Sequence, residues 1–172
     1  MSQNILANVG EPVPLYAVQA LVDDPPAHFS DKQKRRLASF ADRYEQAIRK
    51  AQRDRYAAAM GVVKETRDAI TGSIEDHSQH VKKIHDAVAH GRMEPDDARK
   101  DLTATFREIK ALRDRLEGLT RSERAAWDVT CLDADEYQVS RLERFPSLAQ
   151  HLPRISQAWL DGEDEHDPLG ND

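Results

Sequence analysis

A regular alternation of four- and three-residue steps between apolar side chains constrains the fold of this chain more than any other feature. The series consists of Ala98, Leu102, Thr105, Ile109, Leu112, Leu116 and Leu119. Thr105 is its one polar member. Residues at these steps lie along one stripe of an α-helix, and the alternation is typical of a coiled-coil seam. The sequence therefore predicts a helix that packs against another helix along this stripe.

A longer series of apolar residues comes earlier in the chain and has the same rhythm with one interruption. It consists of Leu37, Ala41, Tyr44, Ile48 and Ala51, then Tyr56, Met60 and Val63, then Ile70, Ile74, Val81, Ile84 and Val88. The change of phase between residues 55 and 63 resembles a stutter, which changes the supercoil locally. This pattern predicts a long amphipathic helix.

The ends of this helix are indicated by residues that typically begin and end helices. Ser30 is a good N-cap, and the His90-Gly91 pair is a usual C-terminal stop. A helix over residues 31–89 would be roughly 90 Å long at 1.5 Å per residue. Gly72, followed by a Ser73 that could act as a new cap, predicts a kink or break within it.

The connection between the two predicted helices is short, because Pro95 is well placed to open the second helix. A connection of a few residues favours an antiparallel hairpin. The side chains expected at its interface are Leu102, Ile109, Leu112 and Leu116 on one helix and Ile70, Ile74, Val81, Ile84 and Val88 on the other.

Further short helices are predicted after the hairpin. Thr120 with Glu123 has the spacing of a capping box, which predicts that a third helix begins there. Asp133 with Glu136 offers a second start, and Pro146 ends the segment. A last short apolar segment follows and includes Trp159.

The predicted fold class is therefore all-α, with one long amphipathic helix, a coiled-coil-like antiparallel hairpin and short C-terminal helices. We expect a single helical hairpin or bundle domain over residues 31–160. Residues 1–30 are expected to form an extended arm with one short helix after Pro14. Residues 161–172 are acidic and lack aliphatic side chains apart from Leu169, so this tail is predicted to be disordered.

Composition excludes several classes of protein. Apolar residues make up 39% of the chain and charged residues 33%, which favours solvated helices with narrow buried stripes. No stretch approaches the length of an apolar membrane span, so no membrane association is expected. With one cysteine and no secretory signal, the expected location is cytoplasmic, in a bacterial or infected host cell, and a virion is also compatible.

Motifs for catalysis or cofactor binding are missing from the sequence. The seven glycines are scattered and form neither a phosphate loop nor a dinucleotide fingerprint. Cys131 is the one thiol and is expected to be a small, at least half-buried hydrophobe near Trp127. We therefore predict a protein that is not an enzyme and that has no catalytic residues and no cofactor.

A histidine-rich stretch is a candidate metal site. It contains Asp76, His77, His80, His85 and His90. His77 and His80 could converge, but a closed zinc site needs four ligands, usually from a second segment, and the second helix has no histidine. His77 also continues the apolar stripe of the long helix. We therefore predict that His77 and His80 bind no functional metal.

A basic stretch opens the long helix and supports an alternative function as a nucleic-acid-associated regulator. Residues 31–56 hold nine Lys or Arg and four Asp or Glu. The side chains that would contact nucleic acid are Lys32, Lys34, Arg35, Arg36, Arg49, Lys50 and Arg53. Basic helices bind phosphates in this way, but an ordinary solvated face has the same composition.

The leading prediction is a non-enzymatic protein-protein interaction, assembly or adaptor protein, for example a bacteriophage or bacterial accessory component. A second helix of about 25 residues spans roughly 38 Å and covers less than half of the first helix. The apolar side chains left for a protein partner or a second copy are Leu37, Phe40, Tyr44, Ile48 and Tyr56, with Trp159 from the C-terminal segment. The competing interpretation is that the C-terminal segments fold back and cover this surface internally.

Overall fold

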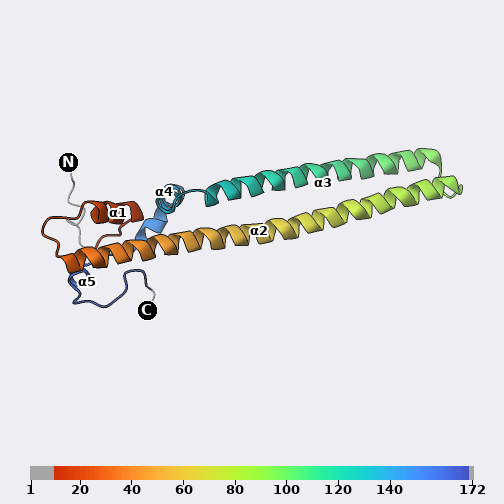
Figure 1. The fold of residues 1–172 in the computed structure, drawn as a ribbon. Coiled ribbons are helices and arrows are strands. Elements are labelled where there is room, and N and C mark those ends of the chain that lie inside the picture. Colours follow the sequence, from red (N-terminus) through yellow and green to blue (C-terminus); the bar gives the residue numbers. More distant parts are fainter. Residues whose placement is uncertain (1–9, 171–172) are drawn as a thin grey trace. The chain divides into compact units, whose positions relative to one another are not determined.

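The structure is a computed structural model that describes residues 10–170 (Figure 1). Its helices are α1 (Leu15–Asp23), α2 (Asp31–Ala89), α3 (Pro95–Thr130), α4 (Ala134–Arg144), the short 3-10 helix η2 (Pro146–His151) and α5 (Gln157–Asp161). The described residues contain no β-strand, which confirms the all-α class. No helix in this part of the chain is both long enough and apolar enough to cross a membrane.

Two compact units share helix α2. Unit 1 combines the chain up to Asp54 with the chain from Cys131 onward, and unit 2 comprises Arg55–Thr130. The predicted segments had their boundaries at residues 30 and 160. The contacts group the chain differently, because the arm and the C-terminal segment both pack on the first turns of α2.

The start of α2 agrees with the predicted N-cap. The Gln33 backbone N–H donates to the Ser30 hydroxyl at 3.3 Å, and the Ser30 N–H donates to the Gln33 side chain at 2.7 Å. These reciprocal bonds satisfy donors that the first turn of a helix leaves unpaired. The break predicted near Gly72 is not present, because α2 continues through it. A helical glycine costs about 1 kcal/mol, and Ile70 and Ile74 on either side are held in the hairpin.

The end of α2 has the geometry of a Schellman motif. Gly91 has a φ of 65°, in the left-handed region that favours glycine. The Arg92 N–H donates to the Ala87 carbonyl at 2.8 Å, and the Gly91 N–H donates to the Val88 carbonyl at 3.0 Å. Both bonds satisfy carbonyls that the last turn would otherwise leave unpaired, as the sequence predicts for this glycine.

Helix α3 is longer than predicted and continues through the proposed capping box. The Thr120 hydroxyl donates to the Leu116 carbonyl at 3.3 Å within the helix. The Glu123 carboxylate forms an ion pair with Arg67 instead of capping a new helix. The chain breaks at the second predicted start, where the Asp133 N–H donates to the Glu136 carboxylate at 3.4 Å. Cys131 lies in this break and is exposed, so the prediction of a buried or half-buried thiol is wrong.

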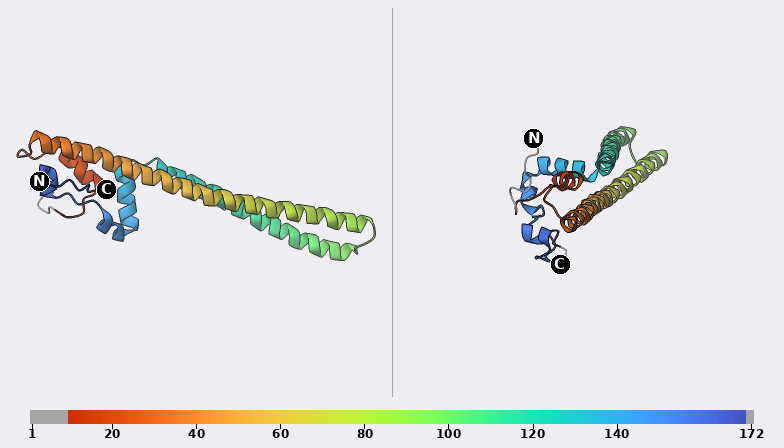
Figure 2. Two further views of the ribbon diagram at one scale, coloured as in Figure 1. Left: turned by 90° about the horizontal axis from the view of Figure 1, so that it is seen from below. Right: turned by 60° about the vertical axis from the view of Figure 1, so that its left-hand side comes forward.

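Unit 2 is the predicted antiparallel hairpin of α2 and α3, seen side by side in Figures 1 and 2. Its buried seam residues are Ile70, Ile84, Ala98, Thr105 and Ile109. The other residues expected at this interface are half-buried: Ile74, Val81, Val88, Leu102, Leu112 and Leu116. Two helices cover only one side of each apolar stripe, so the seam keeps contact with solvent along its edges.

The main apolar core belongs to unit 1, where α1, α4 and α5 pack against the first turns of α2. Its largest fully buried side chains are Phe40, Leu15, Leu37, Ile155, Leu160 and Val18. The Phe40 ring contacts the Trp159 ring edge-to-face, with centroids 5.4 Å apart. Aromatic pairs in this geometry add to the stabilisation that burial provides.

A buried hydrogen-bond network connects the arm, α2 and α4 inside this core. The Gln138 amide donates to the Tyr44 hydroxyl at 2.6 Å, and the Leu15 N–H donates to the Gln138 side-chain oxygen at 2.6 Å. The Tyr44 hydroxyl in turn donates to the Val13 carbonyl at 3.2 Å. Burial raises the pKa of Tyr44 to about 12, and the Gln138 hydrogen bond opposes this shift in part.

We predict that Phe40→Ala destabilises unit 1 by about 3–5 kcal/mol, because a fully buried ring is replaced by a cavity. The matched control is Tyr16→Ala in the same unit, since Tyr16 is 53% exposed and its loss should cost about 0.5 kcal/mol or less. Urea unfolding followed by Trp159 fluorescence in a Trp127→Phe background measures both. Equal losses for the two variants would contradict this core assignment.

A second prediction concerns alkaline pH. The folded-state pKa of Tyr44, about 12, lies above its ordinary value of 10.0. The stability that neutral Tyr44 contributes is therefore complete below about pH 10 and is lost as pH rises toward about 12, up to roughly 2–3 kcal/mol. Unfolding free energies across this range should fall more steeply in the wild type than in Tyr44→Phe. Tyr16→Phe should keep the wild-type dependence of unfolding free energy on pH. The same dependence in all three proteins would contradict the prediction.

Candidate interaction face of the hairpin

The residues predicted to meet a partner lie inside the protein. Leu37, Phe40, Tyr44, Ile48 and Trp159 are all buried in the unit 1 core. Tyr56 belongs to unit 2, where it is half-buried and its ring contacts Trp127 with centroids 5.8 Å apart. The predicted interface is therefore corrected: the five unit 1 side chains pack within the chain, as the competing fold-back interpretation requires, because α1, α4 and α5 cover the first turns of α2. Tyr56 instead packs against α3.

The C-terminal tail contacts part of the basic stretch, although it was expected to be disordered. The Lys32 ammonium donates to the Asp161 carbonyl at 3.1 Å. Arg36 donates to the Asp164 carbonyl at 2.9 Å, and its guanidinium lies 4.6 Å from the centroid of the Trp159 ring.

Two further arginines of α2 form ion pairs within unit 1. Arg43 pairs with Asp167 at 2.8 Å. Arg49 pairs with Glu45 at 2.8 Å and with Asp133 at 3.5 Å.

The remaining basic side chains of the stretch do not all lie on one side of α2. Lys34, Arg35, Lys50 and Arg53 are exposed. Arg35 donates to the Asp31 carbonyl at 3.2 Å. Lys34 and Lys50 are separated by a rotation of roughly 160° around the helix at 3.6 residues per turn. The predicted nucleic-acid contacts are therefore divided between side chains bound by unit 1 and cations on different sides of α2.

The histidines predicted to bind no metal each face a single carboxylate across the hairpin. His77 Nε2 lies 3.3 Å from a Glu108 oxygen, and His80 Nε2 lies 3.4 Å from an Asp101 oxygen. Among residues 10–170, no three His, Cys, Asp or Glu side chains converge as a metal site would require. We call the side of the hairpin with these two contacts the ion-pair face.

The other side of the hairpin is lined by two exposed aromatic rings. On α3, a seven-residue spacing places Arg99, Phe106, Arg113, Thr120 and Trp127 on this side. On α2, the same spacing places Ala57, Lys64, Thr71, Ser78 and His85 there. Phe106 is 54% exposed and Trp127 is 56% exposed. We call these ten positions the aromatic face.

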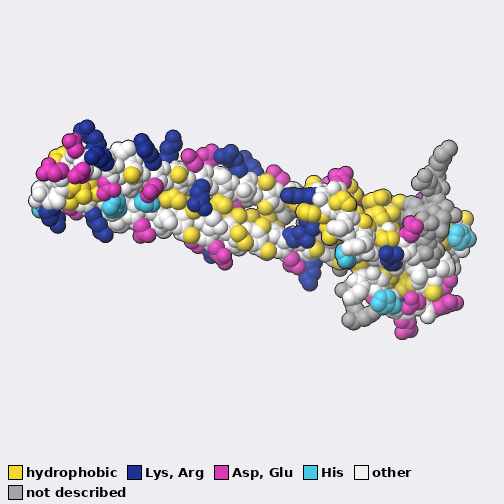
Figure 3. All heavy atoms as spheres, turned by 180° about the vertical axis from the view of Figure 1, so that it is seen from behind, with side chains coloured by type: hydrophobic (Ala, Val, Ile, Leu, Met, Phe, Trp, Pro, Cys, Tyr) yellow, Lys and Arg dark blue, Asp and Glu magenta, His cyan; other side chains and the backbone are white. Residues whose placement is uncertain are grey.

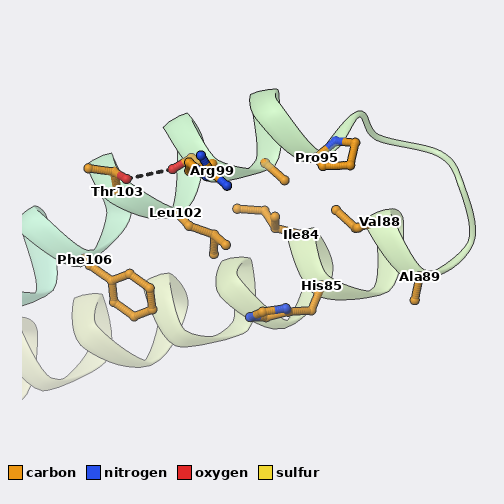
Figure 4. Close-up of a pocket in the computed structure, with 10 residues that line it drawn as sticks. Ile84, His85, Val88, Ala89, Pro95, Arg99, Leu102, Thr103 and Phe106 are labelled. Atoms are coloured by element: carbon orange, nitrogen blue, oxygen red, sulfur yellow. Dashed lines mark hydrogen bonds between the residues drawn. The ribbon is translucent and has the colours of Figure 1, made fainter.

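An apolar groove opens on the aromatic face near the tip of the hairpin, with a volume of about 510 Å³. Its apolar lining includes Ile84, Val88, Ala98, Leu102 and Phe106. Figure 4 shows Leu102 and Phe106 directed from α3 toward α2, with His85 on the α2 side. Arg99 also lines the groove. The groove therefore combines apolar walls with a cation at its edge.

The two faces of the hairpin differ in how their charges are paired. Asp101 and Glu108 on the ion-pair face each have a histidine opposite them. Within the described residues, no ion pair involves Lys64, Arg99 or Arg113 of the aromatic face. Figure 3 shows hydrophobic side chains exposed among charged ones along the hairpin on the side that it draws.

Sequence reasoning missed the aromatic face, although a signal for it was present. Phe106 and Trp127 directly follow the seam positions Thr105 and Ala126, and they are three heptads apart. A large apolar residue beside a seam, repeated at multiples of seven, marks a second apolar stripe. No protein-family model, curated protein or solved structure matches this chain.

We predict that the histidine pairs of the ion-pair face bind no metal. Each histidine has one carboxylate partner, and structural zinc usually needs four ligands. Elemental analysis of untagged protein should find no stoichiometric metal. His77→Gln with His80→Gln should leave the helical circular dichroism unchanged. Bound metal that disappears in the double variant would show the prediction to be wrong.

Proposed function

We propose that this chain is a non-enzymatic interaction protein of the assembly or adaptor kind, which binds a protein partner through the aromatic face of unit 2. The observation that carries this proposal is the exposure of Phe106 at an apolar groove and of Trp127 further along the same side of the hairpin, both above 50%. An apolar groove edged by a large exposed aromatic side chain is typical of protein-protein interaction sites. Aromatic side chains also dominate the energetics of such interfaces.

The lining of the groove favours binding over catalysis. Its polar side chains are His85, Arg99 and Thr103. The Thr103 hydroxyl donates to the Arg99 carbonyl at 2.7 Å, so its proton is already engaged. A catalytic site would need a nucleophile or an acid-base pair within hydrogen-bonding reach of a reacting group. A groove with mostly apolar walls instead fits the side chains of another helix.

A nucleic-acid-associated function is the alternative, and the contacts of unit 1 weigh against it. Lys32, Arg36, Arg43 and Arg49 are engaged by other residues of the same chain. The contacts of Lys32, Arg36 and Arg43 with the acidic tail would compete with nucleic acid for these three side chains. A phosphate-binding surface would also make affinity fall steeply as salt rises, whereas an apolar helical interface changes little.

The proposal predicts a stoichiometric protein partner that depends on the aromatic face. Tagged wild-type protein purified from its own host should retain that partner, and Phe106→Asp with Trp127→Asp should lose it. A buried carboxylate in the interface would have no counter-charge or hydrogen-bond partner, which is strongly unfavourable. Val62→Asp is the matched control, because Val62 is 64% exposed and lies off the aromatic face.

Partner recovery is measured by mass spectrometry at matched bait amounts, in low and high salt. Equal recovery with the double variant and the wild type would contradict the proposal. Recovery of nucleic acid in place of protein, lost at high salt, would favour the alternative function.

A further inference from the structure

We infer that the aromatic face binds an acidic amphipathic helix of about three heptads from a different protein. The inference rests on the proposed function and names the chemistry of the partner. Phe106 and Trp127 are 21 positions apart on α3, which corresponds to roughly 32 Å along a helix at 1.5 Å per residue. A partner helix of about 21 residues would therefore reach from the groove to the Trp127 ring.

The shape of the face fits a helix. The groove lies between α2 and α3, and side chains of a third helix can insert between ridges of two neighbouring helices. The contacts His77–Glu108 and Tyr56–Trp127 set the register of the antiparallel hairpin. In this register the small side chains of Ser78 and Ala57 on α2 are about level with the large rings of Phe106 and Trp127 on α3. A partner helix could approach α2 closely at these positions and contact both rings.

The charges of the face select an acidic partner. Lys64, Arg99 and Arg113 are exposed, occupy the positions between and beside the aromatic rings, and form none of the ion pairs seen within the described residues. None of the ten positions of the face is acidic. Glu or Asp on the flanks of the partner's apolar stripe would pair with these cations, as flanking charges do in coiled coils.

A second copy of this chain fits the face less well. A two-fold pairing places the same patch against itself. It would bring two sets of Lys64, Arg99 and Arg113 together with no carboxylate at any position of either face. Like charges juxtaposed in an interface are unfavourable and exclude wrong partners. The charge pattern therefore favours a hetero-complex.

Single-stranded nucleic acid also uses aromatic rings and arginines, but the rest of unit 2 does not support it. Residues 55–130 hold 14 Lys or Arg and 14 Asp or Glu, so the hairpin has no excess of positive charge. Nucleic-acid binding depends on such an excess to neutralise phosphates. The groove walls are mostly apolar and offer few donors to bases.

The test uses the full chain and two labelled helical peptides of about 21 residues, with the same Leu and Ile stripe. One peptide carries Glu at every flanking position and the other carries Lys there. Fluorescence anisotropy should show at least tenfold tighter binding of the Glu peptide, a difference of about 1.4 kcal/mol. Phe106→Ala should weaken binding of the Glu peptide.

Charge variants test which cations cause the preference for the Glu peptide. Lys64→Glu, Arg99→Glu and Arg113→Glu together should abolish the preference for the Glu peptide. The matched control is Arg55→Glu, Lys83→Glu and Arg107→Glu, three exposed cations off the aromatic face with the same change in net charge. The control should retain the preference, and circular dichroism should show that both triple variants are folded.

Equal binding of both peptides, or equal effects of the two triple variants, would overturn the inference. Binding of single-stranded DNA of roughly 20 nucleotides more tightly than the Glu peptide would also overturn it. So would a dimer in light scattering that Phe106→Asp dissociates. A natural partner that depends on the aromatic face, combined with no preference for the Glu peptide, would leave the proposed function standing and refute its acidic-helix form. Preference for the Glu peptide without any natural partner that depends on the aromatic face would support the charge selectivity of the face and contradict the proposed function.

Discussion

The burial of one apolar stripe along α2 is the constraint on which the rest of the structure depends. A helix of 59 residues with a largely polar surface is stable in water only where its apolar side is covered. Different segments provide that cover: α1, α4 and α5 around the first turns, and α3 along the remainder. Each unit forms where different helices pack against this stripe of α2. A break in α2 would therefore destabilise both units.

The two kinds of cover have different consequences for function. In unit 1 several elements surround Phe40 and Tyr44, and even the buried polar atoms of Tyr44 and Gln138 find partners. In unit 2 a single helix faces the stripe, so the edges of the seam stay accessible and Phe106 and Trp127 remain more than half exposed. We therefore propose that the hairpin provides the binding surface, with the aromatic rings on one of its sides, and the cations there that form no ion pair within the described residues, as the source of its specificity.

Sequence reasoning succeeded where a structural feature depends on neighbouring residues. Ser30, Gly91 and Asp133 act as predicted, because a cap or a left-handed turn is decided within a few residues. It failed at Thr120, where a capping-box spacing occurs inside a helix. There the carboxylate of Glu123 has a better partner in Arg67, which is 56 residues away in the sequence and invisible to a local rule.

Local sequence was enough to decide that the chain is helical, where most of its helices begin and end, and that the two long ones form an antiparallel hairpin. Hydrophobic period, caps and connection length act over a few turns and can be read directly. Only the tertiary structure decided which apolar side chains are core and which are surface. Ile48 and Leu112 are both large apolar residues on the predicted stripes of long helices, yet the first is buried and the second is only half-buried. The difference lies in which distant segment folds over each of them, and no neighbouring residue carries that information.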